Sequence, residues 1–139
     1  MGTPQVQGGK RAGSVFIREP FARSSDSEQV LNVVNASLTA ALVIPAGFPM
    51  SGSHPSVGAE ANTCDGLTAD AYEIPINSTG KVVIIKRGAG TVVDYTALPK
   101  TDLLGTSIDT QAFKDRIGLL GLGFMLRNES PYTQTPGPQ

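Results

Sequence analysis

The sequence is poor in the residues that build disulfides, metal sites and stacking platforms. Among its 139 residues it has no tryptophan, one cysteine and one histidine, and aromatic residues make up 6%. Cys64 therefore has no partner for an internal disulfide or a cysteine-rich zinc site, and His54 cannot form a multi-histidine site. So few aromatic rings also supply little surface for stacking on sugars or nucleic-acid bases. These absences predict a protein without a metal ion or another cofactor.

Long hydrophobic runs are missing as well. The longest uncharged apolar stretch covers residues 117–126, whereas a helix needs ~20 apolar residues to cross a bilayer. Residues 1–10 lack the apolar segment of a secretory signal. We therefore expect no membrane partner.

Charge of one sign is absent from a large part of the chain. The formal net charge is only −1, so no global field attracts nucleic acid. Residues 30–80 contain no Lys or Arg but four acidic residues, Glu60, Asp65, Asp70 and Glu73. A solvated surface normally mixes both signs. This segment is either a run of Ser-, Ala- and Gly-rich loops without lysine, or a face that meets a basic partner or is covered by assembly.

Glycine and proline, in contrast, are abundant. The chain has Gly 16 and Pro 10, more than average usage, which favours many turns over long helices. Several dense apolar runs remain to form a core. We therefore expect an extended N-terminal arm over residues 1–29, a β-rich domain over 30–127 and a Pro-rich C-terminal tail over 128–139.

Short β-branched and apolar runs between turn residues predict strands in the middle of the chain. The clearest is 81–86, whose four β-branched residues suggest a strand covered on both faces. Pro75 restricts the run 71–76 to an edge strand. The other expected strands are 30–34, 38–44, 91–95 and 122–126, with a loop over 49–70 and a turn over 77–80.

One helix is expected, over residues 109–120. Phe113, Ile117 and Leu120 recur at the helical spacing i, i+4 and i+7 and would form its buried face. Gly121 then provides a plausible left-handed end. The fold class is therefore mainly β with one short α-helix.

The chain offers little that could carry catalysis. His54 lies in a Pro- and Gly-rich loop, where a loosely held imidazole is a poor general base. Cys64 is followed by an acid, Asp65, which would raise rather than lower the pKa of the thiol. The spacing of Asp65, Asp70 and Glu73 matches no EF-hand calcium loop. We therefore expect that the protein is not an enzyme.

The N-terminal arm contains one dense motif, residues 15–21. Phe16 and Phe21 are two of only five Phe in the chain, and their place in a polar arm suggests that the arm docks on something. Two alternatives stay open: the motif packs on the chain's own core, or it docks on a neighbouring subunit or partner.

Several short segments together resemble the lambda-type family of head decoration (capsid cement) proteins of tailed bacteriophages. The resemblance covers about 90 of the 139 residues, from Leu38 to Arg127, and depends on the order and spacing of its pieces. These pieces are the strand and turn 42–47, Asp65-Gly66, residues 69–71, the run 81–88, residues 91–94, Ala97-Leu98, and the helix 108–113 leading to 119–124.

The resemblance implies a compact β-barrel or β-tulip-like domain that assembles as a homotrimer. Such trimers bind the major capsid protein at local three-fold positions on the outside of the expanded shell and stabilise it, after synthesis in the host cytoplasm. The arm residues that would bind the capsid here are Val15, Phe16, Ile17, Arg18 and Phe21. No nucleic acid or membrane is implied as a partner.

Two other classes of function remain alternatives. One is another virion or tail assembly module with the same β architecture. The other is a small-ligand-binding β domain, and an unrecognised hydrolase that uses His54 is a more distant possibility.

Overall fold

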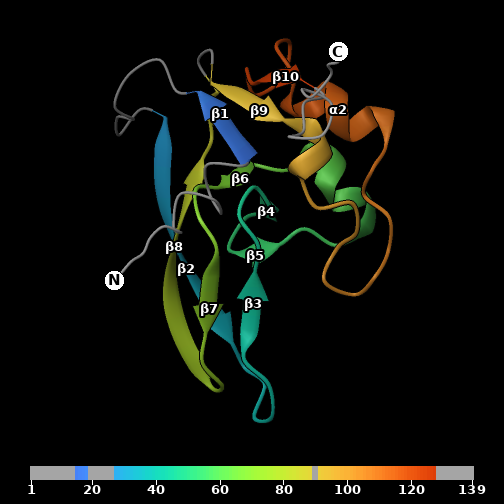
Figure 1. Cartoon of the computed structure of the whole chain (residues 1–139). Helices are drawn as coiled ribbons and strands as arrows, with labels where there is room; N and C mark the ends of the chain where they lie inside the picture. Colours follow the sequence, from blue (N-terminus) through green and yellow to red (C-terminus); the bar gives the residue numbers. More distant parts are fainter. Residues whose placement is uncertain (1–14, 19–26, 89–90, 128–139) are drawn as a thin grey trace, which may run out of the picture.

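The computed structural model describes residues 15–18, 27–88 and 91–127, and it is mainly β with one α-helix, as the sequence predicts (Figure 1). The helix is α2 (Gln111–Ile117), and two 3-10 helices are η1 (Gly58–Thr63) and η2 (Tyr95–Ala97). The strands are β1 (Phe16–Arg18), β2 (Glu28–Asn35), β3 (Leu42–Ile44), β4 (Pro49–Ser51), β5 (His54–Pro55), β6 (Gly66–Thr68), β7 (Tyr72–Ile74), β8 (Ser78–Ile85), β9 (Val92–Asp94) and β10 (Met125–Arg127). Within these residues no helix is both long and apolar enough to span a membrane.

The longest ladder joins β2 and β8, which run antiparallel over eight residues each. Leu31 and Val33 face the core while Val30 and Val34 are exposed, the alternation expected of a strand with one solvated face. On β8, Val82, Ile84 and Ile85 are all buried, as the sequence predicts for a strand covered at its centre. The full sheet has the order β2-β8-β6-β4-β5.

Two smaller sheets complete the fold. In one, β9 lies between β1, which is antiparallel to it, and β10, which is parallel to it. In the other, β3 pairs with β7, so the expected edge strand before Pro75 is confirmed. The core between the sheets and α2 includes Phe48, Phe113 and Phe124.

The prediction of a loop over 49–70 is wrong, because this segment contains β4, β5, η1 and β6. These strands are only two or three residues long. β5 forms a local hairpin with β4, whereas β6 pairs with more distant residues, such as Ile85 opposite Leu67. The strand expected over 38–44 begins only at Leu42. The turn expected over 77–80 is confined to Asn77, whose φ is 49°, since β8 begins at Ser78.

The helix is shorter than predicted. Thr110 begins it by accepting a hydrogen bond from the Phe113 N–H at 3.1 Å, and Gly118 ends it. Phe113 and Ile117 are buried as expected. Leu120 is fully exposed, so the prediction that it belongs to the buried face of the helix is wrong. The chain leaves helical geometry at Gly118, and the i+7 position therefore no longer lies above Phe113.

The described residues of the segment assigned to the arm, 15–18 and 27–29, contribute to the folded body. Strand β1 pairs with β9, and β2 already begins at Glu28, whereas the sequence placed β1 and the first two residues of β2 within an arm that ends at residue 29. Val15 packs so closely on Gly47 that a Cβ at that glycine would lie 2.7 Å from the valine side chain.

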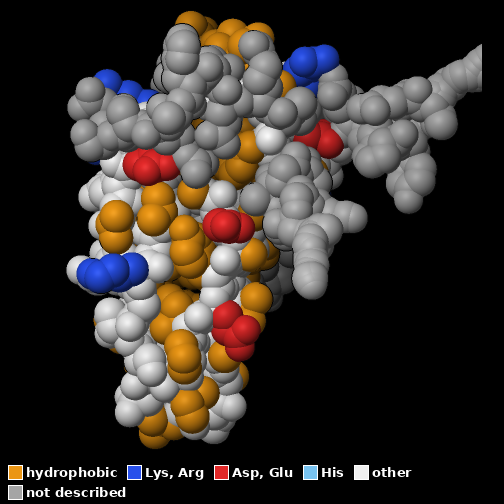
Figure 2. Space-filling view, turned by 60° about the vertical axis from the view of Figure 1, so that its left-hand side comes forward, with side chains coloured by type: hydrophobic (Ala, Val, Ile, Leu, Met, Phe, Trp, Pro, Cys, Tyr) orange, Lys and Arg blue, Asp and Glu red, His pale blue; other side chains and the backbone are white. Residues whose placement is uncertain are grey.

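The β2–β8 ladder reaches down to an apolar tip. Figure 2 shows hydrophobic side chains running along the lower half of this face with few charged groups between them. The exposed apolar residues of this region include Val34, Leu38, Val43 and Ile76.

Candidate assembly surface

The two residues that the sequence singled out for nucleophilic or acid–base chemistry, His54 and Cys64, have different surroundings. The exposed His54 imidazole is bonded through Nε2 to Glu60 Oε1 at 3.0 Å. The backbone N–H of Val57 and then His54 hold the pKa of Glu60 below its usual value. Burial raises the pKa of Cys64 to about 11, Asp65 adds to that shift, and Arg116 opposes it. A thiol with this pKa is protonated at neutral pH and is a poor nucleophile.

Two of the three acids considered for calcium accept hydrogen bonds from backbone N–H groups, and the third lies in a strand. Asp65 Oδ2 accepts a hydrogen bond from the Gly52 N–H at 2.7 Å, Asp70 caps the N–H of Ala71, and Glu73 lies opposite Val43 in the β3–β7 pair. Across 15–18, 27–88 and 91–127, no three His, Cys, Asp or Glu side chains are grouped so that they could hold a metal ion.

The predicted capsid-binding residues divide into two groups. Val15 and Phe16 are buried in the chain's own core, and the Phe16 and Phe124 ring centroids are 6.4 Å apart. For these two side chains the structure therefore selects the first of the two alternatives left open by the sequence. Ile17 and Arg18 lie in β1, and Phe21 lies outside the described residues.

Exposed leucines on tightly held loops are the surface feature that the sequence analysis missed. The first is Leu38, 71% exposed, between β2 and β3. Buried Asn35 holds this loop, because its Nδ2 donates to the carbonyls of Ala40, Ile74 and Pro75 at 3.0–3.1 Å. Its Oδ1 also accepts from the Ser37 N–H.

The second loop displays Leu103 and Leu104 and is held by buried Asp102. Asp102 Oδ1 accepts from the N–H groups of Leu104 and Thr106, and its Oδ2 accepts from the Gly58 N–H, at 2.8–2.9 Å. Leu104 is 78% exposed. One carboxylate thus fixes the leucine loop to the start of η1.

The Asp102 carboxylate should make the stability of this loop depend on acid pH. Burial alone would raise the pKa of Asp102, but the N–H donors of Thr106, Gly58 and Leu104 outweigh burial and lower it. A carboxyl whose pKa is lower in the folded than in the unfolded state stabilises the fold above its unfolded pKa, and that contribution is lost as pH falls through the folded value. We therefore expect Asp102→Asn to flatten the fall in melting temperature below about pH 4. An unchanged acid profile in calorimetry would contradict this role.

The third loop carries Leu119 and Leu120 directly after α2. Gly121 has no room for a side chain, because a Cβ there would lie 1.8 Å from the Arg116 carbonyl oxygen. The Gly121 and Gly123 N–H groups both donate to the Gly118 carbonyl, which closes the loop. Leu119 is 67% exposed and Leu120 fully exposed.

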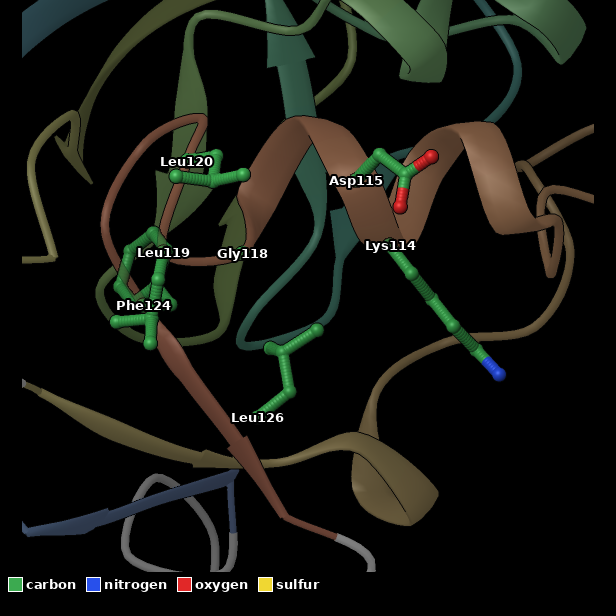
Figure 3. Close-up of a pocket in the computed structure, with 7 residues that line it drawn as sticks. All are labelled: Lys114, Asp115, Gly118, Leu119, Leu120, Phe124 and Leu126. Atoms are coloured by element: carbon green, nitrogen blue, oxygen red, sulfur yellow. The ribbon is translucent and has the colours of Figure 1, made fainter.

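A groove of about 640 Å³ lies beside this third loop, and we call it the Leu120 groove. Figure 3 shows Leu119, Leu120 and Phe124 on one side of it, with Lys114 and Asp115 projecting from α2 on the other. Leu126 and Gly118 complete its lining. The groove is thus largely apolar, with one cation and one anion at its rim.

The second loop borders another apolar hollow, of about 270 Å³, which we call the Leu104 surface. Its lining residues are Leu42, His54, Pro55, Ser56, Val57, Leu103 and Leu104. The carboxylate of Glu60 lies at its edge, bonded to His54 and to the Val57 N–H. The charged group at this edge is therefore an acid.

Comparisons with protein-family models, with curated proteins and with solved structures found no match to this chain.

The signal that could have revealed two of the three loops is a Leu-Leu-Gly sequence, which occurs at 103–105 and again at 119–121. The glycine that directly follows each leucine pair marks a turn at that point of the chain.

Proposed function

We propose that this chain is a structural virion protein that binds the outer surface of the expanded phage capsid as a trimer, at local three-fold positions, and stabilises the shell. The observation that carries the proposal is the set of three exposed leucine sites on loops that are already fixed by hydrogen bonds. Docking of a rigid apolar surface costs little conformational entropy. Such a surface favours assembly with another protein over catalysis.

Three of the segments behind the resemblance to decoration proteins add support, because they fall on or lead into regular elements. Residues 42–47 comprise β3 and a turn at Gly47 with φ 74°, and residues 81–88 lie mainly on β8. The run 108–113 leads into α2. These segments therefore occur in the expected order along the chain and within a mainly β fold with one α-helix.

Co-sedimentation with shells that lack the protein tests the proposal. We expect saturable binding to expanded shells and none to unexpanded shells, with three copies bound at each three-fold position. Equal binding to both shell forms, or binding to neither, would contradict it. Binding to isolated tails alone would favour a different assembly module.

A further inference from the structure

Strand β2 forms one edge of the five-stranded sheet, and half of its backbone groups point outward. The Lys86 N–H donates to the Ser27 carbonyl at 2.8 Å, so the odd-numbered residues from Ser27 onward are the ones that bond to β8. The N–H and C=O groups of Val30, Asn32 and Val34 therefore point away from β8. Within residues 15–18, 27–88 and 91–127, no strand pairs with this side of β2.

Strand β2 also lacks the features by which edge strands avoid pairing with other chains. Such strands usually carry lysine, proline or a bulge, or are very short. β2 has eight residues in unbroken register with β8, and its only charge is Glu28 at one end. Val30 and Val34 are 56% and 64% exposed on its solvent face. A long, regular and apolar edge of this kind favours the addition of another strand.

The outward residues of β2 are self-complementary, which points to a second copy as that strand. Val30, Asn32 and Val34 read the same in both directions, with an amide between two valines. When two copies of β2 run antiparallel with Asn32 opposite Asn32, each Val30 lies opposite a Val34, and apolar cross-strand pairs stabilise a sheet. Glu28 then lies past the end of the other β2, so no like charges meet along the paired strands.

The side chain of Asn32 suits a position on the two-fold axis of this pair. Its Oδ1 accepts a hydrogen bond from Lys81 Nζ at 3.2 Å, and its Nδ2 can donate to the amide of the second copy. Lys81 lies on β8, one strand away from the new contact, so the two copies of this lysine stay apart.

We infer that β2 of one copy pairs antiparallel with β2 of a second copy about a two-fold axis at Asn32, which joins their two sheets into one. This contact uses the same patch on both copies and therefore closes as a pair. It goes beyond the proposed function, because it differs from the three-fold contact of the proposed trimer and would join one copy in each of two trimers. One strand per copy buries less than a standard interface of ~1,600 Å², so the association is weak in solution.

Disulfide trapping in the full chain tests this register and captures a weak contact. Opposed residues of a hydrogen-bonded antiparallel pair have Cα atoms ~5.5 Å apart, a separation that a disulfide spans. Under mild oxidation Asn32→Cys should therefore form a covalent dimer about 10-fold faster than Val30→Cys. Val30→Cys is the matched control: it lies on the same strand and face, but in this register its counterpart is offset by four residues, or roughly 14 Å along the strand. The native Cys64 is buried and should not react.

A mixture of two variants tests the same register independently. Val30→Cys and Val34→Cys should each link slowly alone, but in a 1:1 mixture they should link about as fast as Asn32→Cys, because residue 30 lies opposite residue 34. All three positions are exposed, so the reduced variants should keep the wild-type melting temperature.

The outcomes separate this contact from the other possible occupants of the edge and from the proposed function. Equal rates for Asn32→Cys and Val30→Cys, or a mixture no faster than its components, would overturn the inference. Shells that protect Asn32→Cys from oxidation, with no covalent dimer in solution up to about 1 mM, would assign the edge to a shell strand and overturn it too. Register-specific trapping of a protein that binds no shell would support this contact and overturn only the proposed function.

Discussion

Replacing Phe16 with alanine is expected to lower the free energy of unfolding by about 3–5 kcal/mol. Phe16 is only 6% exposed and packs against Phe124, which is completely buried. Its strand β1 also pairs with β9, so the truncated side chain would leave a cavity between two sheet elements and the core. Since a domain is typically stable by about 5–15 kcal/mol, this loss would be large.

Urea denaturation of the two phenylalanine variants gives the measurement. Phe16→Ala should move the midpoint down by on the order of 2 M with little change in the slope. Phe21→Ala, the second aromatic residue of the motif, serves as the comparison: we expect it to weaken binding to shells while the unfolding midpoint stays near that of the wild type. An unchanged midpoint for Phe16→Ala would mean that the motif does not belong to the folded body.

Replacing Asn35 with alanine is the second change with a large expected effect. The side chain donates to the carbonyls of Ala40, Ile74 and Pro75 and accepts from the Ser37 N–H. Each buried partner left without a hydrogen bond costs about 1–3 kcal/mol. The carbonyl of Ile74 is the most deeply buried of these contacts, so it should account for most of the loss.

Asn32 on the same strand offers a matched control. It is exposed, and its Oδ1 accepts a single hydrogen bond from Lys81 Nζ at 3.2 Å. Asn32→Ala should therefore change the free energy of unfolding by no more than about 0.5 kcal/mol. Asn35→Ala should in addition speed hydrogen exchange in residues 36–41 and 75–77, since it releases the loop that presents Leu38. Equal stability and equal exchange in the two variants would contradict the role assigned to Asn35.

The sequence by itself determined the fold class and the central ladder. The β-branched run at 81–86 and the apolar residues at 30–34 favour strands, and they form β8 and β2, because their side chains suit a pleated and partly buried surface. Phe113 and Ile117 likewise predict one amphipathic turn of helix that survives in α2. Composition alone also limited the candidates for imidazole or thiol chemistry to His54 and Cys64.

Only the tertiary structure decided how the short strands and the loops are used. β4, β5 and β6 are too short to show a period. β5 pairs only with the neighbouring β4, but β4 and β6 pair with each other and β6 pairs with β8, and these partners lie 16 to 18 residues away, beyond the reach of a local pattern. Phe16 could pack inward or outward with the same local sequence, and its choice depends on Phe124, more than a hundred residues away. The exposure of Leu104 and Leu120 is decided in the same way. Asp102 bonds to the Leu104 N–H and holds the first loop away from the core, and the close approach of Gly121 to Arg116 fixes the turn that keeps Leu120 on the surface.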